Sequence, residues 1–289
     1  MRPQRAVYPF EPEQDGVPSV GGTMTESFFT TADGEWFQPT DPCRGPWDPN
    51  SCHAGPPTGL LARASELLLP DQQLVRLTVE LTRPVPFAGF SIGAETTRAG
   101  RTVSTTSISL LDGSGRTVVT ARGMHITADQ PFEMPTAPHR MPRLADAEHG
   151  HFPLSNFSHG LPGFSSGVEV RYPPDDGPHP GPTRMWMRSL PLLPDEDPSP
   201  FQRICPLADC GNAVSRNADP ASVAFMNTDL TILLHRPPEG DWLGMDSVSR
   251  WESNGIGMSD SLLFDDIGPV GRALQSLVLR PATPSGDTA

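Results

Sequence analysis

The sequence predicts an α+β protein made of two similar halves, each combining one helix with an antiparallel sheet. The first observation is a repeat: Leu81-Thr82-Arg83-Pro84 returns as Leu234-His235-Arg236-Pro237, at an offset of 153 residues (234 − 81). The stretches 110–113 and 263–266 correspond at the same offset. In both halves a proline-led apolar segment also precedes a series of strand-like runs. Two copies of one fold plan account for all three features.

The first half opens with short strands predicted at 28–31 and 36–40, around an Asp33-Gly34 turn that is typical of hairpins. A helix is predicted to begin at Pro56-Pro57, because the first helical turn does not need the N–H that proline lacks. The apolar residues that follow have the spacing of one helical face: Leu60, Leu61, Ala64, Leu67 and Leu68. Strands are then predicted at 74–81, 90–98, 102–111 and 117–126, the first with clear apolar–polar alternation.

The segment 127–166 is rich in Pro, His, Gly and Ser and predicts a linker or surface loop. After it, the second half repeats the order of the first. Strands are predicted at 168–172 and 185–190, a helix at about 199–215, and strands at 224–235, 242–251, 255–264 and 271–279. We therefore expect a tail at 1–22, one unit at 23–126, the linker at 127–166, a second unit at 167–282 and a tail at 283–289.

Composition excludes several classes of function. The net charge is −13 and all 21 basic residues are arginine, which argues against nucleic acid as a partner. No apolar run is long enough for a signal peptide or a membrane span, so a cytoplasmic location is expected. The four cysteines lack zinc-like spacing and are expected to be reduced thiols, and the histidines of 125–179 are expected to be solvated. No metal or other cofactor is predicted.

The repeat is chemically asymmetric, and this asymmetry points to a site in the second half. In the register of the repeat, Asp229 faces Arg76 and Gln275 faces Thr120. A partly desolvated aspartate can serve as a general base, and a glutamine amide can hold a water molecule. Such a pair suffices for attack on an activated carbonyl. A turn or capping role for Asp229 is the competing structural interpretation.

Several motifs, taken in order, resemble a known family. The loop 51–57 (Ser-Cys-His-Ala-Gly-Pro-Pro) resembles the one that opens the first central helix of thioesterase-like double hotdog proteins. The stretches 229–238, 241–243, 255–257 and 268–275 resemble the second hotdog of bacterial type II acyl-CoA thioesterases. The resemblance implies a double hotdog fold, in which each central helix is wrapped by an antiparallel sheet.

In that family an aspartate, a threonine or serine, and a glutamine orient the water that attacks the thioester. The resemblance implies catalytic roles for Asp229 and Gln275. The family's threonine falls near Trp251, so the nearest hydroxyls are Ser249 and Ser253.

Three further residues are expected to bind substrate: His53 and Gly55, before and at the start of the first helix, and Asp209 in the second helix. Free N–H groups at a helix start, at 55–59 or 206–211, are expected to hold the carbonyl oxygen. Asp209 is also a candidate for an alternative acid or a helix cap.

The resemblance implies an acyl-CoA or other acyl thioester substrate, a place in fatty acid metabolism and a homo-oligomer. Two alternatives stay open. One is a hotdog lyase or cyclase acting on carrier-bound acyl chains, which needs a histidine paired with an acid. His53 has the right position for it, but no acid follows at the usual short spacing. The other alternative is a non-catalytic acyl-binding protein.

Overall fold

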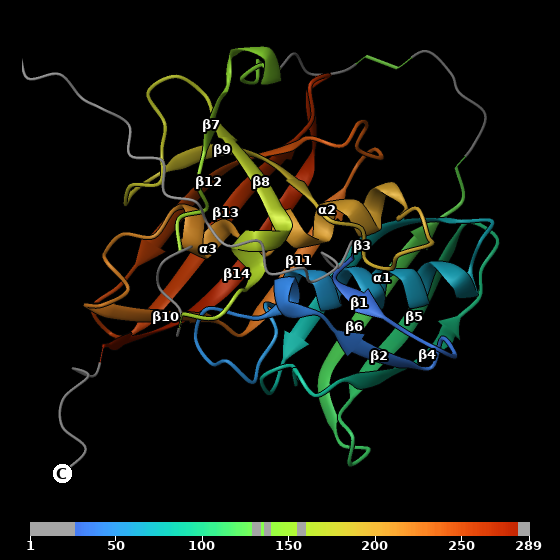
Figure 1. The fold of residues 1–289 in the computed structure, drawn as a ribbon. Coiled ribbons are helices and arrows are strands. Elements are labelled where there is room, and N and C mark those ends of the chain that lie inside the picture. Colours follow the sequence, from blue (N-terminus) through green and yellow to red (C-terminus); the bar gives the residue numbers. More distant parts are fainter. Residues whose placement is uncertain (1–26, 129–133, 136–139, 155–159, 283–289) are drawn as a thin grey trace, which may run out of the picture.

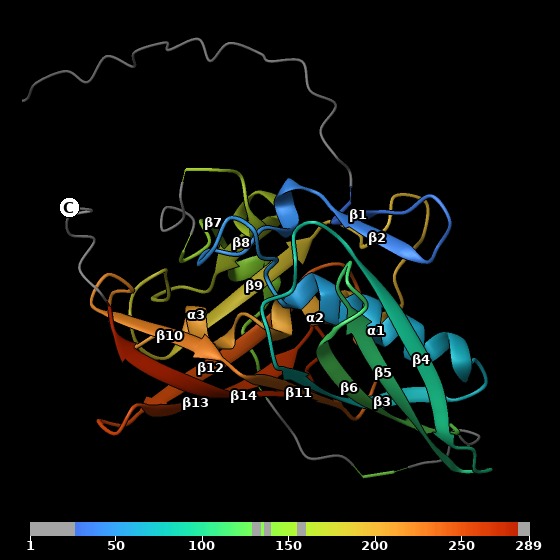
Figure 2. The same ribbon diagram turned by 90° about the horizontal axis from the view of Figure 1, so that it is seen from below.

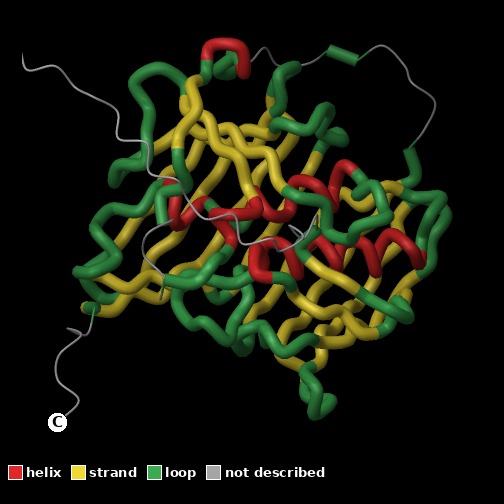
Figure 3. Tube along the Cα trace, in the orientation of Figure 1, coloured by secondary structure: helices red, strands yellow, loops and turns green. Residues whose placement is uncertain are grey.

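One large antiparallel sheet curves around two central helices in the computed structural model (Figure 1). The structure describes residues 27–128, 134–135, 140–154 and 160–282, so the predicted tails 1–22 and 283–289 lie outside the described residues. Seen from below, the sheet forms a floor beneath the helices (Figure 2), and the helices run side by side through the middle of the molecule (Figure 3). The predicted α+β double hotdog fold is confirmed.

The first half contains two short strands, the long helix α1 and four longer strands in the spatial order β4-β5-β6-β3. Its elements are β1 (Phe29–Thr30), β2 (Trp36–Pro39), α1 (Gly55–Leu68), β3 (Gln73–Leu81), β4 (Phe90–Arg98), β5 (Val103–Leu111) and β6 (Thr117–Ile126). The predicted helix and strands of this half are therefore all present. Helix α1 carries prolines at its second and third residues and buries Leu60 and Leu61 against the sheet.

The second half repeats this plan with a shorter and broken helix. Its elements are β7 (Glu148–Gly150), β8 (Val168–Tyr172), β9 (Thr183–Ser189), α2 (Pro200–Ala208), α3 (Gly211–Val214), β10 (Val223–Asn227), β11 (Asp229–Leu234), β12 (Leu243–Trp251), β13 (Ile256–Phe264) and β14 (Pro269–Pro281). Helix α2 begins with a capping contact in which the Gln202 N–H donates to the Ser199 hydroxyl at 3.1 Å. Among the described residues, no helix is long and apolar enough to cross a membrane.

The two halves join in the middle of the sheet, where β3 pairs with β11. The central pairs of this ladder are Leu77 with Ile232, Thr78 with Thr231, and Val79 with Leu230. Thr78 and Thr231 are 153 residues apart (231 − 78), which is the offset of the sequence repeat. The same offset relates Leu77 to Leu230 and Val79 to Ile232, so it exchanges the two flanking pairs. An approximate two-fold axis between Thr78 and Thr231 requires this exchange. The repeat therefore sets the register of the central ladder.

Three predicted elements differ in the structure. The helix predicted at 199–215 is interrupted at Asp209 and Cys210, between α2 and α3. The strand predicted at 224–235 is interrupted at Thr228, between β10 and β11. The predicted linker contributes to the folded core through Phe152 and Phe164, which are buried and pack edge-to-face. Both interruptions border one cavity, which Asp209 and Thr228 help to line.

Candidate active site

Asp209 occupies the break between the two helices of the second half. Its side chain is only 4% exposed, and its backbone caps the C-terminal end of α2. Pro206, inside α2, lacks the N–H of a regular helical bond, and the helix ends two residues later, at Ala208. Gly211 lets the next turn approach the sheet closely, because a Cβ there would lie 2.6 Å from the Ser259 and Ser261 hydroxyl oxygens.

Three amide groups fix the Asp209 carboxyl and its surroundings. Gln275 Nε2 donates to Asp209 Oδ1 at 3.1 Å and to the Asp209 carbonyl at 3.0 Å. Gln275 Oε1 accepts the Asn212 N–H at 3.0 Å, so both ends of this buried amide are engaged. Asn227 Nδ2 donates to Asp209 Oδ1 at 2.8 Å. The carboxyl, which lies between α2 and α3, is held by side chains from two elements that are distant in sequence, β10 and β14.

The interruption between β10 and β11 explains the position of Asn227. Both strands pair with β14, but three residues lie between Asn227 and Thr231, whereas only two lie between their partners Leu277 and Leu274. This extra residue is a β-bulge, and bulges redirect side chains beside functional sites. The Asp229 carboxylate accepts the Ser276 N–H at 2.6 Å within the bulge. Asp229 thus replaces a ladder bond, while the Asn227 side chain turns towards Asp209.

His53 reaches the same carboxyl from the first half of the chain. His53 Nδ1 lies 3.2 Å from Asp209 Oδ2 and accepts the Gly55 N–H at 3.2 Å. Its ring stacks on Phe164, with centroids 3.8 Å apart and planes 8° from parallel. Gly55 permits this approach, since a Cβ there would lie 2.9 Å from the Pro206 backbone. The close packing of α1 on α2 therefore brings His53 and Asp209 together.

Burial shifts the pKa values of both groups in the direction that favours their neutral forms. It raises the pKa of Asp209 from 3.8 to about 7, although hydrogen bonds from Asn227, Gln275 and Gly55 act against this shift. Burial also lowers the pKa of His53 from 6.5 to about 3, so the imidazole is neutral near pH 7. The pair contains a carboxyl that titrates near neutrality beside an uncharged ring. A carboxyl with such a pKa suits general-base catalysis.

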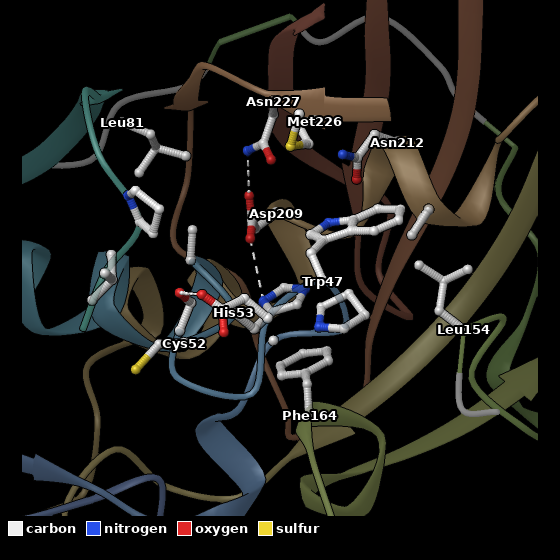
Figure 4. A pocket seen from close by; sticks show the side chains of 18 of the residues that line it. Trp47, Cys52, His53, Leu81, Leu154, Phe164, Asp209, Asn212, Met226 and Asn227 are labelled. Carbon is white, nitrogen blue, oxygen red and sulfur yellow. Dashed lines mark hydrogen bonds and ion pairs between the residues drawn. The ribbon is translucent and has the colours of Figure 1, made fainter. Parts of the chain in front are cut away.

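A cavity of about 470 Å³ adjoins this cluster (Figure 4). Asp209, His53, Asn212 and Asn227 form part of its wall. Much of the remaining wall is apolar and aromatic, with contributions from both halves and from the predicted linker: Trp47, Leu81, Phe152, Leu154, Phe164, Phe225, Met226 and Val278. A few convergent polar groups at the wall of an apolar cavity are typical of small-molecule sites.

The predicted site residues fall into two groups. Gln275, His53, Gly55 and Asp209 come together, and the acid beside Gln275 is Asp209. The expected proximity of Gln275 and Asp229 is replaced by the contact with Asp209, because the Asp229 carboxylate faces the Ser276 backbone.

The two predicted hydroxyls lie away from the cavity wall. Ser249 is buried and shares a 2.8 Å hydrogen bond with Ser215, and Ser253 is exposed in the turn between β12 and β13. The third polar side chain at Asp209 is Asn227, which the sequence analysis did not identify. It lies two residues before Asp229, just ahead of the motif 229–238, and only a β-bulge at this point turns its side chain towards Asp209.

A family model of the acyl-CoA thioesterase N-terminal domain matches residues 43–126, and a model of the C-terminal domain matches residues 135–279. The chain belongs to the acyl-CoA thioesterase family. Membership indicates a thioesterase-like function, and the matched ranges contain His53, Asp209, Asn227 and Gln275. No curated protein matches the sequence.

Solved structures share the fold at low sequence identity. A candidate thioesterase II of Thermobifida fusca YX is 18% identical, with a TM-score of 0.68 over 88% of this chain and 96% of its own. The tesB protein of Mycobacterium avium subspecies paratuberculosis is 15% identical, with a TM-score of 0.61 over 88% and 96%. An acyl-CoA thioesterase II of Mycobacterium marinum is 18% identical, with a TM-score of 0.57 over 91% and 98%. These similarities establish a common fold over nearly the whole length of each protein.

No group of three or more His, Cys, Asp or Glu side chains that could hold a metal ion occurs within the described ranges. The polar cluster instead consists of one carboxyl, one neutral imidazole and amide groups. This cluster can accept one proton and can orient a small polar molecule at the cavity wall.

Proposed function

We propose that the protein hydrolyses an acyl-CoA thioester to a carboxylic acid and free CoA, with Asp209 as the general base. The observation that carries this proposal is the convergence of Asn227 and Gln275 on Asp209, which lies at the wall of an apolar cavity. The base is thus Asp209 and not Asp229, the residue predicted from the sequence. Asp229 takes the structural role of holding the bulge.

The reaction requires only one proton carrier. A water oxygen bonds to the thioester carbonyl carbon while Asp209 accepts a proton from that water, and the C=O π electrons move to the carbonyl oxygen. When the tetrahedral intermediate collapses, the C=O bond re-forms and the C–S bond breaks. Asp209 then returns its proton to the leaving sulfur. A carboxyl with a pKa near 7 suits both transfers, because it accepts and releases a proton near neutral pH.

The two amides act differently on this proton carrier. Gln275 is a positioning residue, since both ends of its amide are engaged by Asp209 and Asn212. Asn227 lines the cavity, and its Nδ2 donates to Asp209, which leaves Oδ1 to accept the second hydrogen of the attacking water. In this proposal Asn227 supplies the polar contact that a threonine or serine supplies in the family.

The cavity wall accounts for the remaining parts of the substrate. The acyl chain would occupy the apolar region around Trp47, Leu154 and Phe225. Arg83 lines the same cavity and is exposed, which suits it to meet a phosphate of CoA. A carrier-protein thioester presents a different phosphate arrangement, so Arg83 provides a means to distinguish the two substrate classes.

The test is thiol release from acyl-CoAs of varied chain length by the full-length protein. Wild type should release thiol, Asp209→Asn should lose at least about 10³-fold in kcat, and the rate should rise with pH through about 7. Asp229→Asn is the matched control and should keep most of the activity. The proposal fails if wild type and Asp209→Asn are equally slow on every acyl-CoA. Bound acyl-CoA in native mass spectra without turnover would instead identify a non-catalytic acyl-binding protein.

A second candidate function is hydration of a 2-enoyl thioester, and the contact between His53 and Asp209 favours it. No acid follows His53 at short spacing in the sequence, but Asp209 supplies one from the other half of the molecule. In hydration, water oxygen adds to the β-carbon and a proton to the α-carbon, so the C–S bond survives. Crotonyl-CoA separates the two reactions: loss of the enoyl absorbance without thiol release would support hydration.

A further inference from the structure

The His53 ring is fixed in one orientation at the cavity wall. One face stacks on Phe164, and Nδ1 accepts the Gly55 N–H at 3.2 Å. The side chain is only 10% exposed, yet the ring borders the cavity (Figure 4). A histidine held by stacking and by a backbone hydrogen bond has little freedom to rotate, so its second nitrogen keeps a constant direction.

The hydrogen bond from Gly55 favours one of the two tautomers of the ring. Because the backbone N–H donates to Nδ1, we assign the lone pair to this nitrogen and the proton of the neutral ring to Nε2. Burial lowers the pKa of His53 to about 3, which keeps the ring neutral at physiological pH. Within the described part of the chain, His53 Nε2 has no hydrogen-bond partner, and this atom is not fully buried. His53 thus offers an N–H donor to an occupant of the cavity.

The first turn of α1 cannot supply the carbonyl oxygen with the backbone donors expected from the sequence. Gly55 N–H is used by His53, and Pro56 and Pro57 have no N–H. The next N–H, of Thr58, donates to the Ala54 carbonyl at 3.0 Å. At α3, the Asn212 N–H is likewise used by Gln275. A developing oxyanion therefore needs a donor other than these backbone groups.

We propose that His53 Nε2–H donates a hydrogen bond to the thioester carbonyl oxygen and stabilises the oxyanion of the tetrahedral intermediate. This inference rests on the proposed function and adds a catalytic residue to it. No proton leaves Nε2: the C=O π electrons move to oxygen, and the neutral imidazole acts as a hydrogen-bond donor. The donor comes from the first half of the chain and the base from the second half, so the reaction requires both halves.

The other ring nitrogen supports the base. Asp209 Oδ2 lies 3.2 Å from His53 Nδ1. Once Asp209 has accepted the proton of water, its new O–H can share the Nδ1 lone pair with the Gly55 N–H. His53 thereby contacts the protonated base on one side and the oxyanion on the other, at the same stage of the reaction.

The experiment compares His53→Phe, which keeps a flat ring but has no donor, with His53→Gln, which places an amide N–H near the Nε2 position. Single-turnover thiol release from saturating acyl-CoA should fall about 10²–10³-fold in His53→Phe, the usual cost of one oxyanion donor. His53→Gln should recover at least about tenfold, with KM within about threefold of wild type in both. Phe164→Leu is the matched control: it removes the stacking but keeps the donor, and should lose less than His53→Phe.

A spectroscopic readout does not depend on turnover. A ¹³C-carbonyl ketone analogue of acyl-CoA, with CH₂ in place of sulfur, should show a downfield carbonyl shift when bound to wild type. The shift should be lost in His53→Phe and regained in part in His53→Gln, with thermal unfolding midpoints confirming that each variant is folded.

The outcomes separate this inference from the proposed function. If wild type releases thiol and His53→Phe matches it in rate and in the ketone shift, only the role of His53 is wrong. If His53→Gln loses the rise in rate near pH 7, His53 is the base and the inference is overturned. If wild type neither releases thiol nor binds the ketone, both proposals fail.

Discussion

Replacement of Asp209 by asparagine should abolish activity and yet stabilise the protein at alkaline pH. In the unfolded chain this carboxyl releases its proton near pH 3.8, whereas burial raises its pKa in the folded protein to about 7. Between these values the folded state binds more protons than the unfolded state. The free energy of unfolding therefore falls as pH rises through this window, and the loss is complete above about pH 7.

The magnitude follows from the two pKa values. One pKa unit corresponds to about 1.36 kcal/mol, so a difference of about three units makes the ionised carboxyl cost about 4 kcal/mol at pH 8. Asparagine cannot ionise, and its Oδ1 can still accept the hydrogen bonds from Asn227 and Gln275. We expect Asp209→Asn to be more stable than wild type by up to about 4 kcal/mol at pH 8, and by far less at pH 4.

Thermal unfolding followed by circular dichroism at both pH values measures this difference. At roughly 2 °C per kcal/mol for a chain of this size, the variant should unfold up to about 8 °C higher at pH 8. All other titrating groups are common to both proteins and cancel in the comparison. Asp229→Ala is the control: it removes the acceptor of the exposed Ser276 N–H and should be less stable by about 0.5–1.5 kcal/mol at both pH values. If the stability difference between Asp209→Asn and wild type is no larger at pH 8 than at pH 4, the assignment of a raised pKa to this carboxyl is refuted.

The remaining predictions concern water binding, helix packing and substrate class. Asn227→Ala should lower kcat at least about tenfold in thiol-release assays with little change in KM, and Asn227→Thr should restore part of it; equal rates for wild type and Asn227→Ala would remove Asn227 from the mechanism. Gly211→Ala should lower the free energy of unfolding by about 1–3 kcal/mol in urea titrations and reduce activity, because its Cβ would meet the Ser259 hydroxyl at 2.6 Å and move α3 away from Gln275. Arg83→Ala should raise KM for acyl-CoA about tenfold but leave KM for an acyl-N-acetylcysteamine thioester unchanged; equal effects on both would rule out a contact with CoA phosphate.

The sequence predicted the fold well because its signals were periodic and duplicated. Alternation at 74–81 and the apolar face after Pro56 specify a strand and a helix locally. The 153-residue repeat also predicted which strands correspond, and Thr78 and Thr231 do face each other at the junction of the halves. Local patterns and internal repeats do not depend on knowledge of the tertiary structure.

The site was harder to predict because its decisive features are interruptions. Asp209 lay in a predicted continuous helix, where a capping role was a natural interpretation, but the helix ends there and exposes the carboxyl to a cavity. Asn227 turns inward only because a bulge separates β10 from β11. The bulge also directs Asp229 to a backbone N–H. A one-residue shift in a strand reverses which side chains face the core, and periodicity alone does not reveal it.

The contact between His53 and Asp209 was beyond the reach of sequence patterns for a different reason. The two residues belong to different halves and meet only because Gly55 allows α1 to pack closely against Pro206. In the sequence, His53 precedes the first helix and no acid follows it closely along the chain. In the structure the acid comes from the other half.

The most direct test of the proposed mechanism is single-turnover thiol release from an acyl-CoA at pH 8 by wild type, Asp209→Asn and Asp229→Asn. We predict that Asp209→Asn loses at least about 10³-fold, while Asp229→Asn stays within about tenfold of wild type. The reverse order, with Asp229→Asn inactive and Asp209→Asn close to wild type, would contradict the assignment of the buried carboxyl at the cavity as the catalytic base.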